Sequence, residues 1–206
     1  MLDAVRRYYS EKIVAHGATA KCVDWRDEAS QELRFEQLLK VCDPMRPFSL
    51  NDYGCGYGAL ALHLEERGLD VRYTGFDISE EQLAQARELA VESERRRFVV
   101  AEAQLEPADY TVASGIFNVR LDAPADAWQA QALATLDRLD ALSTRGFAFN
   151  MLTSYSDAEL MRDDLWYADP RVVFDHCKRA YSRWVALLHD YGLWEFTILV
   201  RKDVTH

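Results

Sequence analysis

The sequence predicts an α/β fold: a three-layer α-β-α sandwich around a mostly parallel, seven-stranded sheet that ends in an antiparallel C-terminal hairpin. From Ser49 onward, short apolar runs alternate with segments of helical periodicity. This alternation is typical of parallel βαβ units in a doubly wound sheet. Near the C-terminus two strand-like runs are separated by a short turn, which predicts an antiparallel pair. A glycine-rich turn directly after the first strand indicates a ligand site.

Five parallel strands are expected where the apolar runs occur. They lie at 49–53, 72–77, 97–100, 110–114 and 146–151. Helices are predicted from the glycine turn to about 67, from Ser79, and over 126–143. Ser79 followed by Gln82 forms a capping box, which marks the start of the second of these helices.

The last two strands are predicted at 181–188 and 193–201, joined by the turn 189–192. Trp194, Phe196, Ile198 and Val200 alternate with more polar residues, which is the period of a strand. Residues 1 to about 45 are expected to be helical, with one amphipathic segment around Tyr8 and Tyr9 and a second over 28–41. The chain is therefore predicted to be one domain, 1–206. Residues 1–46 would form an N-terminal helical lid, and 152–180 an insert beside the acceptor.

Composition limits the partners. The 206 residues carry a formal net charge of −10, which makes nucleic acid an unlikely substrate because phosphate binding favours a basic surface. A basic run at 95–97 keeps that possibility open. No apolar run reaches the ~20 residues that a membrane helix needs.

The cysteines and the N-terminus suggest a compartment. Four cysteines are scattered without metal-type pairing, at Cys22, Cys42, Cys55 and Cys177. Such sparse cysteines fit reduced thiols, and no metal site is predicted. Because the N-terminal residues lack the apolar core of a signal peptide, we expect a cytoplasmic protein.

The glycine turn is the strongest functional signal. Gly54, Gly56 and Gly58 occupy alternate positions after the first strand, so the backbone can fold tightly and approach a ligand where a Cβ would collide. The apolar helix that follows would point its N-terminus at that ligand. Asp77 closes the second strand, where a carboxylate can accept hydrogen bonds from ribose hydroxyls. The pattern predicts a nucleoside site.

The glycine spacing separates two kinds of nucleoside. Dinucleotide-binding folds have G-x-G-x-x-G, whereas this chain has G-x-G-x-G preceded by Asp52. An acid at this point would repel a pyrophosphate but suits a cationic ligand that carries an ammonium and a sulfonium. The chain here resembles the class I (Rossmann-like) S-adenosylmethionine-dependent methyltransferases, whose first motif is D/E-x-G-x-G-x-G. The resemblance covers residues 50–150 and, through the terminal hairpin, most of the fold.

The resemblance implies roles for residues along the sheet. Asp52 and the turn Gly54, Cys55, Gly56 and Gly58 match the loop that receives the methionine end of S-adenosylmethionine. Asp77 matches the acid that binds both ribose hydroxyls.

The adenine and sulfonium positions follow from the later motifs. Ile78 matches the residue that packs on adenine. Glu102, followed by Ala103, stands where the family usually has an Asp near the adenine amino group, a departure that the longer acid can compensate. Ser114 and Gly115 would lie beside the sulfonium. Arg34 and Tyr9 are expected to contact the cofactor carboxylate from the N-terminal helices, although an exposed Arg34 is equally consistent with the sequence.

The acceptor site is predicted from strand ends and the insert. Asn118 and Arg120 follow the fourth strand and Asn150 ends the fifth, where open α/β sheets bind ligands. Trp166 and Tyr167 lie among carboxylates in the insert and suit a polyhydroxylated acceptor. Helix-entry residues and a lid packed by Trp166 are the structural alternatives. The fourth strand lacks the N/D-P-P-Y/F motif of enzymes that methylate amino groups of DNA bases or protein glutamine.

A hydroxyl acceptor usually needs a general base. His189, followed by Asp190 in the hairpin turn, is the first candidate, because imidazole titrates near neutrality and a carboxylate can fix its tautomer. His16 is the second and His176 the third. A histidine at a hairpin tip is otherwise simply exposed.

The predicted function is therefore methyl transfer from S-adenosylmethionine to a small molecule, such as a hydroxyl of a sugar or secondary metabolite. A non-catalytic cofactor-binding or scaffold protein and a nicotinamide-dependent oxidoreductase are the alternatives. Some relatives use the same cofactor for other group transfers or cyclisations. The sequence leaves the oligomeric state open.

Overall fold

The computed structural model describes residues 1–19, 22 and 27–202, except the side chain of His16. Trp25, in the loop between the two predicted N-terminal helical segments, lies outside the described residues. Within them, no helix is long and apolar enough to cross a membrane.

A seven-stranded sheet forms the middle layer of the molecule, and its order is β3-β2-β1-β4-β5-β7-β6. The strands are β1 (Phe48–Tyr53), β2 (Val71–Phe76), β3 (Arg96–Val99), β4 (Ala108–Ala113), β5 (Ser143–Leu152), β6 (Trp184–Leu188) and β7 (Glu195–Arg201). The first five strands pair in parallel, while β7 runs antiparallel to both β5 and β6. The predicted mostly parallel sheet with its terminal hairpin is confirmed.

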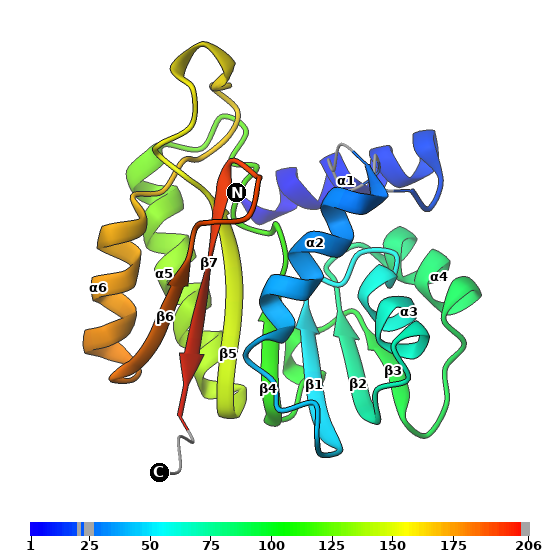
Figure 1. Cartoon of the computed structure of the whole chain (residues 1–206). Helices are drawn as coiled ribbons and strands as arrows, with labels where there is room; N and C mark the ends of the chain where they lie inside the picture. Colours follow the sequence, from blue (N-terminus) through cyan, green and yellow to red (C-terminus); the bar gives the residue numbers. More distant parts are fainter. Residues whose placement is uncertain (20–21, 23–26, 203–206) are drawn as a thin grey trace.

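Helices cover both faces of the sheet (Figure 1). On one face lie α2 (Glu28–Leu39), α3 (Ala59–Glu66) and α4 (Glu80–Leu89), whose apolar side chains share a core with β1, β2 and β4. On the other face, α5 (Ala125–Ala141) and α6 (Pro170–Ala180) pack on a core that contains Phe147, Phe149 and Phe196. Between β3 and β4 the chain makes a short 3-10 turn, η2 (Glu102–Gln104).

The start of α4 differs in one detail from the predicted capping box. The Ser79 hydroxyl accepts a hydrogen bond from the Gln82 N–H at 3.3 Å, as expected. The Gln82 side chain does not accept the Ser79 N–H in return, because that N–H donates to Asp77 Oδ1 at 2.8 Å; the Gln82 amide nitrogen donates to the Tyr9 carbonyl at 3.4 Å. Asp77 therefore takes the reciprocal half of the capping box, and the Gln82 side chain contacts another helix instead.

That other helix is α1 (Leu2–His16), which lies at the end of the sheet where the parallel strands finish (Figure 1). The Ser10 hydroxyl is 2.9 Å from the Ser79 hydroxyl and donates to Glu81 Oε2 at 2.7 Å. These bonds hold α1 against α4, in the position of the predicted lid.

The segment 152–180 is only partly an insert. Its last third is α6, which packs against β6 and β7 and so forms the connection that the sheet requires between β5 and β6. Because α6 runs to Ala180, β6 begins at Trp184 rather than at the predicted 181.

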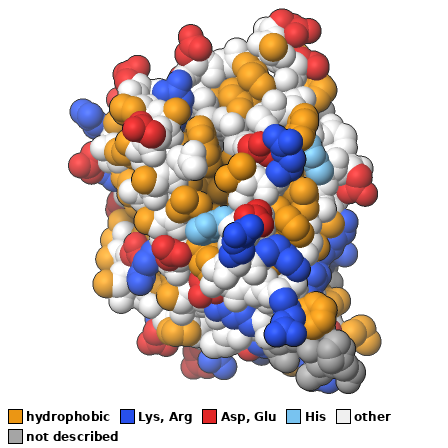
Figure 2. All heavy atoms as spheres, turned by 90° about the vertical axis from the view of Figure 1, so that its left-hand side faces the viewer, with side chains coloured by type: hydrophobic (Ala, Val, Ile, Leu, Met, Phe, Trp, Pro, Cys, Tyr) orange, Lys and Arg blue, Asp and Glu red, His pale blue; other side chains and the backbone are white. Residues whose placement is uncertain are grey.

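The molecular surface over α6 and β6 has hydrophobic side chains interspersed with positive and negative ones, and neither sign of charge covers this face (Figure 2).

The packing of β7 against β5 can be tested at Gly146 in β5. A Cβ there would lie 2.5 Å from the Val200 carbonyl oxygen and 3.2 Å from Val41 Cγ2. Since a backbone oxygen of a central strand cannot move aside cheaply, Gly146→Ala is expected to lower the free energy of unfolding by about 1–3 kcal/mol. Gly192→Ala is the matched control, because nothing lies within 4 Å of its Cβ, and it should change stability by less than about 0.5 kcal/mol. Equal urea midpoints for the two variants would contradict this packing.

Candidate functional site

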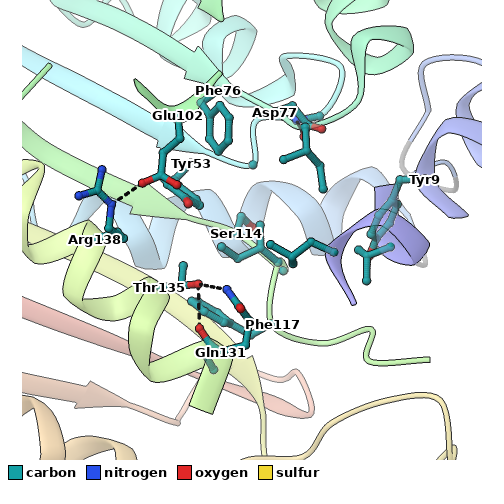
Figure 3. A pocket seen from close by; sticks show the side chains of 18 of the residues that line it. Tyr9, Tyr53, Phe76, Asp77, Glu102, Ser114, Phe117, Gln131, Thr135 and Arg138 are labelled. Atoms are coloured by element: carbon teal, nitrogen blue, oxygen red, sulfur yellow. Dashed lines mark hydrogen bonds and ion pairs between the residues drawn. The ribbon is translucent and has the colours of Figure 1, made fainter. Parts of the chain in front are cut away.

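A cavity of about 310 Å³ opens at the carboxyl end of the sheet, between α1, α4 and α5 (Figure 3). Its lining comes from strand ends, the glycine turn and one face of α5. The residues are Leu2, Val5, Tyr9, Tyr53, Gly54, Gly56, Phe76, Asp77, Ile78, Gln82, Glu102, Ser114, Gly115, Ile116, Phe117, Trp128, Gln131, Ala132, Ala134, Thr135 and Arg138.

The glycine turn forms one wall because its backbone adopts conformations that other residues avoid. Gly54, Gly56 and Gly58 have φ angles of 84°, 54° and 82°, all in the left-handed region that favours glycine. A Cβ on Gly54 would also collide with Ile116 Cγ2 from the segment after β4. The turn therefore packs against the segment after β4 more closely than a Cβ on Gly54 would allow.

Asp77 fixes this turn from the neighbouring strand. Its Oδ2 accepts a hydrogen bond from the Gly56 N–H at 2.9 Å, and its Oδ1 accepts from the Ser79 N–H at 2.8 Å. Burial raises the pKa of Asp77 to about 6, although both N–H donors act to lower it. The carboxylate lines the cavity, so its remaining lone pairs can accept hydrogen bonds from a ligand.

Asp52 lies on the opposite side of the turn and is 3% exposed. The Tyr73 hydroxyl donates to its Oδ2 at 2.7 Å. Burial raises the pKa of Asp52 to about 7, and the nearby Asp77 charge adds to the rise. The Cys55 side chain points into the core against Gly75, so Cys55 offers a ligand its backbone rather than its thiol.

Glu102 closes the far end of the cavity together with two residues that sequence reasoning missed. Arg138 of α5 forms an ion pair with its Oε1, and the Tyr53 side chain lies beside the same carboxylate (Figure 3). This pairing holds the longer acid in place at the position where the resemblance implies adenine. The pair is half exposed, so its effect lies in orientation more than in stability.

The inward face of α5 was also missed by sequence reasoning. Trp128, Gln131, Thr135 and Arg138 recur at helical spacing and line the cavity together. The Gln131 amide donates to the Thr135 hydroxyl at 3.4 Å (Figure 3). The sequence signal that could have identified this face is the recurrence of polar residues at helical spacing within an otherwise apolar stripe of α5.

The remaining predicted cofactor residues divide into two groups. Ile78, Ser114, Gly115 and Tyr9 line the cavity, as the prediction requires. Ala103 is exposed on η2 and does not line it.

Arg34 also lies outside the described cavities. Its Nε is 2.6 Å from Glu195 Oε1, and its Nη1 donates to the Ser30 carbonyl at 2.7 Å. The guanidinium is thus engaged within the protein, where we had expected it to meet a cofactor carboxylate.

The predicted acceptor residues after β4 and β5 are engaged with backbone groups. Asn150 Oδ1 accepts from the Gly115 N–H at 2.7 Å, and Asn118 Oδ1 accepts from the Leu152 N–H at 3.2 Å. Arg120 donates to three backbone carbonyls, those of Ala123, Asp163 and Leu165. These side chains satisfy backbone groups of the loops beyond the sheet and do not line a described cavity.

Trp166 and Tyr167 lie in the same set of loops. The Trp166 side chain packs against the α5–α6 core, and the Trp166 backbone N–H donates to the Asn118 carbonyl at 2.8 Å. The Tyr167 hydroxyl accepts from the Arg162 N–H at 3.1 Å. This arrangement fits the alternative in which Trp166 packs a lid better than it fits direct contact between Trp166 and an acceptor.

Across the described side chains, no histidine lines either cavity. His189 is exposed beyond β6, with its ring 6.0 Å from that of Tyr155 and 6.2 Å from that of Phe196. His176 lies on α6, where Nε2 is 3.1 Å from the Tyr181 hydroxyl. His16 ends α1, but its side chain lies outside the described residues.

The walls of the cavity therefore combine two strand-end acids, a glycine backbone and apolar surface. Such a site can hold a nucleoside whose other end is cationic. Among the described residues there is no cluster of His, Cys, Asp or Glu that could hold a metal ion.

The buried Asp52 carboxyl predicts how stability depends on pH. Burial raises its pKa from 3.8 to about 7, so between about pH 4 and 7 the folded state keeps a proton that the unfolded state has released. The free energy of unfolding consequently falls as the pH rises through this window. Asp52→Asn keeps an acceptor for the Tyr73 hydroxyl but removes this titration. From pH 5 to pH 8 the melting temperature of both proteins should fall, and the fall should be smaller for Asp52→Asn than for the native protein by on the order of 5 °C. Parallel melting curves, measured by calorimetry without ligand, would show that Asp52 is ionised throughout.

Comparisons with known proteins identify the family of this chain. A family model described as a methyltransferase domain matches residues 51–140. A relative from Mycobacterium tuberculosis, "Putative methyltransferase Rv1506c", is 56% identical over 165 residues, which cover 80% of this chain and 99% of the relative.

Solved structures show the same fold at low sequence identity. A DhpI complex with S-adenosylhomocysteine is 15% identical with a TM-score of 0.62, over 95% of this chain and 94% of that one. Human N-acetylserotonin methyltransferase in complex with S-adenosylmethionine is 19% identical with a TM-score of 0.60, and the match covers 98% of this chain and 65% of that one. With the glycine turn, the spaced acids and the terminal hairpin, these matches show that the chain belongs to the class I S-adenosylmethionine-dependent methyltransferases.

Proposed function

We propose that the protein methylates a small molecule, at a hydroxyl such as that of a sugar or secondary metabolite. The observation that carries the proposal is the cavity of about 310 Å³ between the glycine turn, Asp77 and α1. Its size is at the lower end of the range for small-ligand sites. The single sheet that runs through the described chain supports treating 1–206 as one domain.

The residues present fit S-adenosylmethionine. Asp77 would accept the ribose hydroxyls, Glu102 would face the adenine amino group and Asp52 would face the ammonium. The Ser114 hydroxyl is buried without a hydrogen-bond partner among the described residues, which is unusual unless a ligand supplies one. The cofactor supplies a methyl group already activated by its sulfonium. The protein mainly has to hold donor and acceptor in line, which is where large effective concentrations arise.

The walls not assigned to the cofactor suggest the kind of acceptor. Leu2 and Val5 of α1 line the cavity together with Phe117 and Trp128. These apolar side chains favour a secondary metabolite with an apolar part over a free sugar. The net charge of −10 and the mixed charges of the face in Figure 2 support a small molecule over nucleic acid.

A methyl-transfer assay with labelled cofactor tests the acceptor class. We expect label in small-molecule fractions of a metabolite extract, and more in its amphiphilic fractions than in its free sugars. Incorporation confined to protein or RNA would overturn the small-molecule assignment and leave the cofactor assignment intact.

Asp77 should dominate adenosyl binding. Asp77→Ala removes the carboxylate that would accept two ribose hydroxyls, and hydrogen bonds to a charged group contribute about 1.5–3 kcal/mol each. Calorimetric titration with S-adenosylhomocysteine should therefore show affinity reduced on the order of 100-fold. Native affinity should also fall between pH 7.5 and 5, because the pKa of Asp77 is about 6 and protonation removes acceptor capacity. Asp157→Ala, at an exposed position, is the control and should bind normally, while NADH should bind none of these proteins.

His189 should contribute little to turnover, since its ring lies outside the cavity lining. His189→Ala is expected to keep kcat/KM within about threefold of the native value, whereas loss of a general base costs about 100-fold or more. The pH profile of kcat/KM should also stay unchanged. A 100-fold loss with a shifted profile would restore His189 as the base and imply that the hairpin loop closes over the acceptor.

A further inference from the structure

A second, much smaller cavity adjoins the glycine turn. Its volume of about 30 Å³ suffices for one small polar group or a water molecule. Gly54, Gly56 and Ser114 line both cavities, and Gln31 and Asp52 line the small one. The small cavity therefore continues the cofactor site from the sulfonium position toward α2.

Among the described residues, those that line this small cavity include no Lys or Arg. Arg34, which sequence reasoning assigned to the cofactor carboxylate, is held by Glu195 at 2.6 Å. Glu195 is 1% exposed, so the pair is buried, and a buried ion pair is costly to separate. Among the described residues that line this cavity, the donors open to a carboxylate are neutral.

Gln31 of α2 provides such a donor. It is 6% exposed, and the Tyr57 hydroxyl donates to its Oε1 at 2.8 Å. This bond occupies the amide oxygen and orients the side chain. The amide nitrogen, a donor of two hydrogen bonds, makes no hydrogen bond to any part of the chain described by the structure.

Ser114 provides the second donor. Its hydroxyl lies between the two cavities, buried and without a partner in the described chain. A buried hydroxyl that lacks a partner is destabilising, so a ligand group at this point would satisfy it. Asp52, on the same wall, attracts an ammonium and repels a carboxylate. The arrangement thus suits an α-amino acid, with its ammonium toward Asp52 and its carboxylate toward Gln31.

We propose that Gln31 and Ser114 bind the α-carboxylate of the cofactor's methionine end, and that Tyr57 is the positioning residue for the Gln31 amide. Arg34 and Glu195 then serve to hold α2 against β7. Neutral donors suit this place because a cation beside Asp52 would pair with the acid. The inference rests on the cofactor assignment and extends it to residues outside the glycine motif.

Two ligands separate this role from a general effect on the site. S-adenosylhomocysteine carries the amino and carboxyl groups, whereas 5′-methylthioadenosine lacks both. By calorimetric titration, Gln31→Leu should weaken S-adenosylhomocysteine about tenfold or more and leave 5′-methylthioadenosine unchanged. Gln31→Glu should weaken S-adenosylhomocysteine further through charge repulsion. Tyr57→Phe should show the same ligand selectivity to a smaller extent.

Control variants guard against misfolding and displacement of α2. Gln37→Leu removes another buried amide of α2, one that lines neither cavity, and should bind both ligands normally. Ser114→Ala deletes a hydroxyl without a partner, so it should fold at least as stably and weaken only S-adenosylhomocysteine.

Equal weakening of both ligands by Gln31→Leu and Ser114→Ala, or no weakening of either, would overturn the carboxylate role. Native protein that binds neither ligand would overturn the cofactor assignment itself. The two failures are therefore distinguishable.

Discussion

The Asp77 carboxylate is the interaction on which the rest of the site depends. Its two oxygens accept from the N–H groups of Gly56 and Ser79, so one side chain joins the glycine turn after β1 to the start of α4. The Ser79 hydroxyl in turn lies 2.9 Å from the Ser10 hydroxyl of α1. A continuous polar chain thus runs from the cofactor loop to the helix that covers it. A ligand that contacts Asp77 would act on both ends of this chain.

The parts of the site that could be predicted from sequence are those with a local physical cause. A glycine is needed wherever the backbone takes a left-handed φ, as at Gly54, and an acid at a strand end is visible as a single residue. The five parallel strands and the hairpin follow from periodicities of a few residues. These features need no knowledge of distant contacts, and the structure confirms the sheet that they predict.

The acceptor predictions lacked such a local cause. Asn118, Arg120 and Asn150 are polar residues at strand ends, and from sequence they are equally suited to ligand binding and to satisfying the backbone. In the structure, Asn150 takes the Gly115 N–H and Arg120 takes three carbonyls. Which backbone groups become buried depends on how two loops about 40 residues apart meet. The Arg138–Glu102 pair was missed for the same reason, because its partners are 36 residues apart.

The raised pKa values of Asp52 and Asp77 connect stability with function. Both carboxyls sit where burial disfavours their charge, so near neutral pH they reduce the stability of the protein without ligand. A cationic cofactor favours the ionised form of Asp52, and ribose hydroxyls need the acceptors of Asp77. Binding therefore releases protons, and by linkage the cofactor stabilises the fold most where the unliganded protein is weakest. A neutral or amide-lined turn would be more stable alone but would lose this preference for a ligand with a positive charge.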